Sequence, residues 1–156
     1  MYVYAEGNLQ HGVELYPQLS IEAQMREAEL DFYRYLNDVF FQSDEAFYAV
    51  LECDHRYLAA LRMEPYRDGW LLCALETAPN ERKRGYATEL INSVKNYLLV
   101  SGDFKIYSHV SKRNLASLSV HRKCGFKTFL DYAVYLDGSV LHNSCTLVYD
   151  SKKSET

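Results

Sequence analysis

Several features that would place this 156-residue chain in a specialised class are missing from its sequence. No window approaches the roughly eighteen uninterrupted apolar residues of a membrane span. Residues 1–10 have neither the basic start nor the apolar stretch of a secretory signal. We find no internal repeat, low-complexity tract or linker. We therefore expect a cytoplasmic protein that makes no use of a membrane.

Motifs for metals and for common nucleotide loops are missing as well. The four cysteines form no CxxC pair and are widely spaced, at Cys53, Cys73, Cys124 and Cys145. This spacing favours reduced thiols and speaks against a metal site. Neither GxxxxGK[ST] nor GxGxxG occurs, which excludes a Walker loop and the usual dinucleotide fingerprint.

The hydrophobic pattern predicts a single α/β domain over residues 1–150 and a disordered tail over 151–156. A helix is expected from Ser20, because apolar residues follow it at helical spacing. Asp137-Gly138 is a strong hairpin signal between the last two strands. The expected order is β-α-βββ-α-β-α-ββ, a mixed sheet covered by helices, with strands at 2–5, 46–52, 56–63, 69–77, 104–110, 126–136 and 140–149, and later helices at 85–99 and 114–125.

Charge is distributed unevenly along the chain, although the net charge is only -4. Residues 1–80 hold 5 Lys+Arg against 14 Asp+Glu, whereas residues 81–127 hold 10 against 3. The basic segment favours an anionic ligand and the acidic half a cation. Proteins that bind RNA or DNA usually carry a basic domain overall. A small polyphosphate therefore fits this acidic chain better than a nucleic acid.

The segment 77–88 carries most of the functional information. A strand ends, a basic turn follows, and a helix begins at the small residues Gly85 and Ala87. The first N–H groups of a helix lack intrahelical partners and, with the helix dipole, form an anion site. We therefore expect an anion to be bound by residues 82–88, which are Arg82, Lys83, Arg84, Gly85, Tyr86, Ala87 and Thr88. The alternative is an ordinary strand–turn–helix connection with a solvated basic face.

Two blocks resemble the GNAT superfamily of acyl-CoA-dependent N-acyltransferases. Arg82-x-x-Gly85-x-Ala87 is similar to the family's Q/R-x-x-G-x-G/A signature, whose backbone amides bind the coenzyme A diphosphate. The segment from Asn114 to Phe126 resembles the N-x-x-A/S-x-x-L-Y-x-K-x-G-F block that follows the next strand. The resemblance covers residues 45–136 well. It implies a fold in which strands 69–77 and 104–110 splay apart to admit acetyl-CoA, with no metal.

The resemblance also implies roles for individual residues. The backbone groups of Leu75 and Thr77 would pair with the pantetheine arm, and Asn114 and Ser117 would contact the coenzyme. His121 stands where the family usually has the tyrosine that protonates the departing thiolate; an imidazolium could do the same, or His121 could only pack or bind coenzyme A. Asn114 could instead be only a helix N-cap.

The base that frees the amine is assigned first to Glu76, at the end of the strand bordering the thioester. Glu81 is the second candidate, although a turn glutamate beside three basic residues is better explained as a solvated ion pair. A water relay, or a Glu76 that faces solvent or holds the acceptor's ammonium, remains an alternative. These assignments imply direct acetyl transfer from acetyl-CoA to an amine.

The acidic, tyrosine-rich first half favours a cationic acceptor, such as a polyamine, an amino sugar or a peptide N-terminus. One competing function is a non-catalytic acyl-CoA-binding sensor or interaction module of the same fold, favoured by the histidine at position 121. Another is a small RNA-binding domain, which the acidic remainder of the chain argues against. A homodimer is compatible with the sequence, through the last hairpin or the aromatic surfaces.

Overall fold

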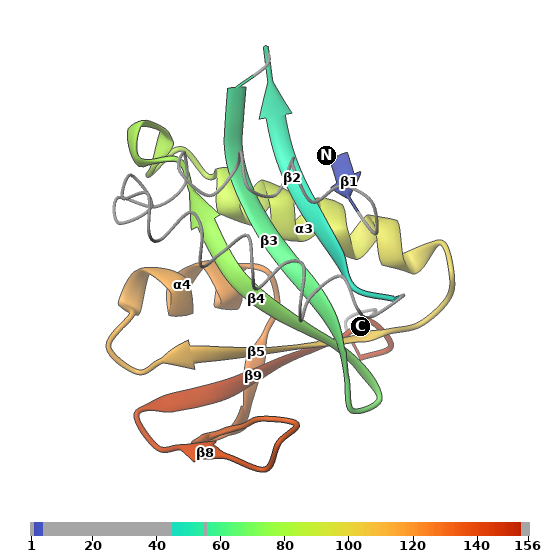
Figure 1. Cartoon of the computed structure of the whole chain (residues 1–156), viewed down its shortest axis with the longest axis vertical. Coiled ribbons are helices and arrows are strands. Elements are labelled where there is room, and N and C mark those ends of the chain that lie inside the picture. The colour runs from blue at the N-terminus through green and yellow to red at the C-terminus, as the bar shows by residue number, and fades with distance from the viewer. Residues whose placement is uncertain (1, 5–44, 55, 154–156) are drawn as a thin grey trace.

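The computed structural model describes residues 2–4, 45–54 and 56–153, and its main feature is a strongly twisted seven-stranded sheet (Figure 1). The strands lie in the order β1-β2-β3-β4-β5-β9-β6. All neighbouring pairs are antiparallel except β4 and β5, which are parallel. The bounds are Tyr2–Tyr4 for β1, Phe47–Cys53 for β2, Arg56–Tyr66 for β3, Gly69–Thr77 for β4, Lys105–Ser111 for β5, Lys127–Leu130 for β6 and Ser144–Asp150 for β9. The helix expected from Ser20 lies outside the described residues.

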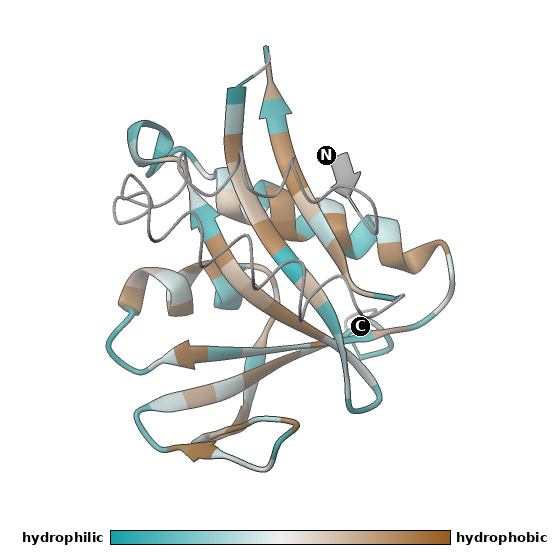
Figure 2. Cartoon of the chain, viewed as in Figure 1, coloured by the Kyte–Doolittle hydropathy of each residue, from teal (hydrophilic) through white to brown (hydrophobic). Residues whose placement is uncertain are grey.

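The core forms where apolar faces of the sheet meet one helix. The predicted meander is confirmed as β2, β3 and β4, whose apolar stretches show as brown bands along the strands (Figure 2). Leu61 and Met63 of β3 and Ile106 of β5 are completely shielded from solvent. Burying such side chains contributes about 1.5–3 kcal/mol each. Their burial therefore stabilises β3 and β5, the two strands that flank β4 in the sheet.

Helix α3 (Tyr86–Leu99) connects β4 to β5 and lies across the back of the sheet in the view of Figure 1. Its buried stripe is Leu90, Ile91, Val94 and Leu98, the spacing of one helical face. The stripe packs with β2, β3 and β4. A short 3-10 turn, η3 (Pro79–Glu81), precedes α3.

Helix α4 (Leu115–Lys123) follows β5 and ends in a Schellman motif, as the predicted cap at Gly125 requires. Gly125 has a φ of +88°, and its N–H donates to the carbonyl of Arg122. Phe126 N–H donates to the carbonyl of His121 at 3.0 Å. Lys95 of α3 donates to the carbonyl of Cys124 at 2.8 Å, so the end of α4 is bound to α3.

The last part of the chain differs from the prediction of two long strands meeting at Asp137-Gly138. The turn is there, with Gly138 at a φ of +88°, but it closes a small separate hairpin of β7 (Ala133–Val134) and β8 (Val140–Leu141). The sheet pairing is made by β6 with β9. The chain thus leaves the sheet after β6, forms the hairpin and returns as β9.

The tail also differs from its prediction at its first residue. Ser151 is buried, donates its N–H to the carbonyl of Phe104 and accepts the Phe104 N–H on its hydroxyl oxygen. Residues 154–156 lie outside the described residues. Among the helices that the structure describes, none has the length and apolar character needed to cross a bilayer.

Candidate active site

The turn between β4 and α3 presents main-chain N–H groups that find no acceptor in the part of the chain that the structure describes. Gly85 is the N-cap of α3 with a φ of +81°, and Lys83 has a φ of +65°. The first helical bond runs from Glu89 N–H to the Gly85 carbonyl, and within the described residues no protein acceptor is found for the amides of 82–88. Glycine fits position 85 because an L side chain is disfavoured at this φ. The predicted anion site therefore has its donors available.

The buried carboxylate of Glu81 forms ion pairs with basic side chains at this turn. Arg82, Lys83 and Arg84 are all exposed. Glu81 is only 7% exposed, and its two oxygens lie 3.0 Å from Arg84 Nη1 and 3.3 Å from Arg56 Nη1. The expected ion pair is present, but only its carboxylate is buried, because the side chains of Arg84 and Arg56 are 60% and 69% exposed. Glu81 anchors the turn, which makes it a poor candidate for the base.

Strands β4 and β5 separate toward their C-terminal ends. The parallel pairing includes only Trp70–Leu72 of β4 and Ile106–Ser108 of β5. Beyond it lies a cavity of about 170 Å³, bordered by both strands and by α4. The lining residues are Leu72, Cys73, Ala74, Leu75, Ser108, His109, Val110, Ser111, Asn114, Ser117 and His121. The expected gap between the two strands is present.

A β-bulge shapes the edge of β4 that faces this gap. The register with β3 passes from Ala60↔Glu76 to Arg62↔Cys73, which leaves Ala74 and Leu75 opposite Leu61. Ala74 has a φ of +50°, a left-handed conformation that costs about 1–2 kcal/mol in a residue with a side chain. Bulges of this kind bend a strand and redirect its groups. Here the bulge lies where β4 leaves β5.

The alternation of hydrogen-bonded and non-bonded pairs between β3 and β4 shows the direction of the Thr77 main-chain N–H and C=O groups. Ala78 N–H donates to the Leu58 carbonyl at 2.9 Å, so these residues form a bonded pair. Bonded and non-bonded pairs alternate in an antiparallel ladder. Thr77, opposite Ala59, therefore points its N–H and C=O away from β3 and toward the gap.

Glu76 and Leu75 lie on opposite faces of the sheet. The Leu75 side chain packs against the core cluster that includes α3, and it lines the gap. Successive side chains of a strand alternate between faces. The half-buried Glu76 side chain therefore leaves the face opposite to α3, next to the point where β4 and β5 separate.

Helix α4 places three of the predicted residues on the gap. Asn114 is the N-cap of α4, and its side-chain oxygen accepts the N–H of Ser117 at 3.1 Å. Asn114, Ser117 and His121 all line the cavity. The structure thus shows the capping role for Asn114, and the same residue also borders the space between the strands.

The His121 ring is fixed in one tautomer. It is 1% exposed, and Nδ1 lies 2.7 Å from the Ser117 carbonyl oxygen. A carbonyl can only accept, so Nδ1 carries the hydrogen. Nε2 has no hydrogen-bond partner among the described residues. The Phe126 ring packs against the imidazole edge to face, with centroids 5.0 Å apart.

The pKa of His121 is lowered from its ordinary value because the ring is buried; the bond to Ser117 opposes this effect only in part. The charged form of a buried imidazole has lost its hydration. At neutral pH the ring is therefore mainly neutral, with the lone pair on Nε2. In this state Nε2 can accept a proton but has none to give.

Sequence reasoning missed two titratable residues that line the gap. His109 of β5 hydrogen-bonds Thr146 Oγ1 through Nδ1 at 3.1 Å, and Cys73 of β4 is half-buried. Burial raises the pKa of the Cys73 thiol to about 12, so the thiol stays protonated and unreactive at neutral pH. Four consecutive residues of each strand line the gap, so the positions of Cys73 and His109 along the two strands could have identified them once the splayed pair was assumed.

Within the described residues, no three His, Cys, Asp or Glu side chains are grouped closely enough to hold a metal ion. The available donors are instead main-chain N–H groups. Those of the turn suit a diphosphate, and the Thr77 edge suits an amide-bearing chain laid along β4. The residues present therefore fit coenzyme A.

Comparisons with known proteins agree with this geometry. Among solved structures, the chain resembles a spermidine N-acetyltransferase SpeG chimera from Vibrio cholerae, with a TM-score of 0.64, 17% identity and 98% of each chain covered. It also resembles the ribosomal-protein-S18-alanine N-acetyltransferase from Escherichia coli, with a TM-score of 0.63, 14% identity, and 96% of this chain and 92% of that one covered. A third is the PaiA N-acetyltransferase from Thermoplasma acidophilum in complex with coenzyme A, with a TM-score of 0.62, 13% identity, and 96% and 99% covered.

No curated protein sequence matches this chain. The sequence model described as Acetyltransferase (GNAT) family, in contrast, matches residues 13–126, which is more than half of the chain. The match includes the turn before α3, both strands of the splayed pair and α4. The chain therefore belongs to the GNAT family of acetyltransferases, enzymes that take their acetyl group from acetyl-CoA.

Proposed function

We propose that this protein transfers the acetyl group of acetyl-CoA directly to a primary amine of a small cationic molecule or a peptide. The observation that carries the proposal is the row of N–H groups at the start of α3 for which the described residues offer no acceptor, beside a sheet that opens between β4 and β5. The first feature suits the diphosphate and the second the arm that carries the thioester. Together they support binding of the thioester at the gap.

Binding of the donor uses main-chain groups from two elements. The amides of Arg84, Gly85, Tyr86, Ala87 and Thr88 bind the diphosphate, with Arg82 and Lys83 adding positive charge. The N–H and C=O of Thr77, and the main chain of Leu75 beside the bulge, pair with the pantetheine arm. Asn114 and Ser117 contact the coenzyme from α4.

Direct transfer is favoured over an acetylated enzyme. The nearest thiol to the gap, Cys73, is kept protonated by burial, and a thiol in this state is a weak nucleophile. The amine must then attack the thioester itself while both substrates are bound. An alkylammonium acceptor loses two protons during this reaction, one before the attack and one after it.

Glu76 takes the first of these protons. Its side chain leaves the sheet face opposite to α3 at the point where the strands separate, so an acceptor that approaches through the gap from that face meets it. A carboxylate there both attracts the ammonium and removes its proton.

His121 takes the second proton and passes it on. With Nδ1–H bound to Ser117, only Nε2 can exchange a proton, and burial keeps it unprotonated at rest. Nε2 accepts the proton from the nitrogen after attack and, as imidazolium, gives it to the departing thiolate. The carbon–nitrogen bond forms, the carbon–sulfur bond breaks, and coenzyme A leaves as a thiol.

The acceptor class rests on charge. The fold neighbours named above act on amines as different as spermidine and a ribosomal-protein alanine, so the fold alone does not choose among acceptors. Residues 1–80 carry 14 acidic against 5 basic residues, which favours a cationic acceptor.

Two measurements test the function. Acetyl-CoA at about a hundred times its dissociation constant should stabilise the protein by roughly 2.7 kcal/mol, and a panel of amines should then release free thiol from it. Turnover of neutral or acidic amines with none of cationic ones would contradict the acceptor class. Stabilisation without turnover of any amine would instead support the non-catalytic acyl-CoA-binding module that the histidine at position 121 also suggests.

A further inference from the structure

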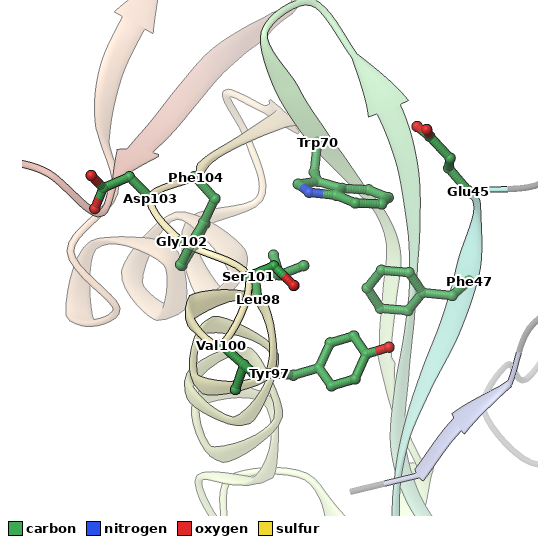
Figure 3. Close-up of a pocket in the computed structure, with 10 residues that line it drawn as sticks. All are labelled: Glu45, Phe47, Trp70, Tyr97, Leu98, Val100, Ser101, Gly102, Asp103 and Phe104. Carbon is green, nitrogen blue, oxygen red and sulfur yellow. The ribbon is translucent and has the colours of Figure 1, made fainter.

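A second and larger cavity lies at the opposite end of α3 from the diphosphate turn (Figure 3). Its volume is about 580 Å³, within the range of roughly 300–1,000 Å³ that is usual for small-molecule sites. It is formed by the end of α3, the loop that follows, and the starts of β2 and β4. The lining residues are Glu45, Phe47, Trp70, Tyr97, Leu98, Val100, Ser101, Gly102, Asp103 and Phe104.

Aromatic rings form one wall of this cavity. Phe47 stands between Trp70 and Tyr97, with ring centroids 5.3 Å and 5.5 Å away and both contacts edge to face. Figure 3 shows the three rings in a row, facing Ser101 and the end of α3. Tyr97 is 48% exposed, although it belongs to this cluster. Tyr97 therefore offers an exposed ring to a ligand that enters from solvent, near the half-buried ring of Trp70.

The charged side chains that the described residues place on the cavity are acidic. Among those lining residues, Glu45 and Asp103 carry a negative charge and none is basic. Glu45 lies on the rim near Trp70, whereas the Asp103 carboxylate turns away from the rings (Figure 3). The last turn of α3 contains no basic residue, so the negative end of its dipole is uncompensated. Aromatic faces, a carboxylate and a helix C-terminus all attract positive charge.

We propose that this cavity binds a small organic cation, an alkylammonium or a methylated ammonium whose charged group lies against the rings of Trp70 and Tyr97. The aliphatic part of the ligand fits beside Leu98 and Phe104 on the floor of the cavity. The 14 residues of α3 separate this site from the diphosphate turn by about 20 Å. The proposal therefore does not depend on the acetyl-transfer function.

The protein contains its own reporter for this site. Trp70 is the only tryptophan of the chain and lines the cavity, so intrinsic tryptophan fluorescence responds to a ligand bound there. We expect butylammonium and butyltrimethylammonium to change this fluorescence saturably. Butanol and butyrate, which share the alkyl chain but are neutral or anionic, should bind at least about tenfold more weakly.

Two substitutions test the location. Tyr97→Leu removes a ring but keeps apolar bulk, and Glu45→Gln removes a charge; each should raise the dissociation constant of butyltrimethylammonium about threefold to tenfold. The matched controls are Tyr132→Leu, an exposed tyrosine near β7, and Glu89→Gln, an exposed carboxylate in the first turn of α3. Neither control should change the constant.

Binding of butanol as tight as that of butylammonium would overturn the proposal. So would unchanged fluorescence at cation concentrations up to about 50 mM, roughly fifty times a dissociation constant of about 1 mM. Equal affinity in Tyr97→Leu, Glu45→Gln and the wild type would place the cation elsewhere and also overturn it. If Tyr97→Leu does not fold, the comparison of ligands on the wild type and the Glu45→Gln variant decides. All these measurements are made without acetyl-CoA, so failure of the acetyltransferase function leaves their outcome unaffected.

Discussion

The two ends of α3 differ in almost every chemical respect. The N-terminal end has a glycine in a left-handed conformation, three exposed basic side chains and main-chain N–H groups that no described residue accepts. The C-terminal end has aromatic rings and acidic side chains, with no basic residue among the described ones that line the cavity or form the last turn. One helix thus supplies the positive end of its dipole to the diphosphate turn and the negative end to a cavity. Counting charged residues in each segment of the sequence does not locate such sites by itself. The fold must also show which end of α3 each segment lies against.

The largest expected effect comes from replacing His121, which lines the gap between β4 and β5. His121→Phe keeps an aromatic ring beside Phe126 but removes Nε2. We expect kcat to fall by about 10²–10³-fold, with little change in acetyl-CoA affinity and none in cation binding at the far end of α3. Steady-state kinetics and calorimetry measure these quantities. The control is His142→Phe, an exposed histidine outside both cavities, and wild-type kcat in His121→Phe would remove His121 from the reaction.

The second-largest expected effect compares two glycines with positive φ, one beside each end of α3. Gly85→Val and Gly102→Val each introduce a side chain at a positive φ with no protein atom within 4 Å of the added Cβ. Both should lose about 1–2 kcal/mol or more of folding free energy. Only Gly85→Val should also raise the acetyl-CoA dissociation constant, by at least about tenfold, because the Cβ enters the space of the diphosphate. Equal affinities in the two variants would contradict the assignment of the turn.

A smaller effect concerns the exposed charges of the turn. Replacing Arg82 and Lys83 together by glutamine should weaken acetyl-CoA binding about threefold to tenfold at low salt, since each exposed charge contributes up to roughly 1 kcal/mol. The difference should shrink at 0.5 M salt, where the screening length is only a few ångströms. The double replacement of Lys152 and Lys153 is the control. A salt-independent loss would indicate a structural role for these side chains.

The smallest expected effect is on the pH dependence of the free energy of unfolding. Burial lowers the pKa of His121 in the folded protein below the unfolded value of about 6.5. The unfolded chain then binds more protons, so stability is complete above about pH 6.5 and decreases as the pH falls through the folded pKa. Urea unfolding between pH 8 and 5 should show this loss in the wild type and a smaller one in His121→Phe. Identical pH dependence in both proteins would show that His121 titrates normally.

Much of the architecture could be predicted because it follows from local periodicity. The strands of the meander, the stripe of α3 and the cap at Gly125 all depend on neighbours within a few residues, and the structure confirms them. The separate β7–β8 hairpin was missed because a turn signal such as Asp137-Gly138 does not reveal how far its flanking strands extend. That length is decided by β9, which pairs with β5 and β6 instead.

The candidate site could be predicted only where it is made of consecutive residues. The turn at 82–88 and the stripe on α4 are local, so their spacing was visible. Glu81 forms an ion pair with Arg56, a residue far away in the sequence, and whether His109 borders the gap depends on which strands separate. The neutral state of His121 follows from burial by Phe126 and its surroundings, which no spacing shows.

The bond from His121 Nδ1 to its own helix has a consequence for evolution at this position. A tyrosine has no atom that could make this bond, so its ring would be released from the helix and its hydroxyl would extend farther into the gap. His121→Tyr is therefore not a return to the usual family arrangement, because the surrounding residues are fitted to a shorter, anchored group. Such a variant would have to acquire compensating changes around the cavity before a longer acid could function there.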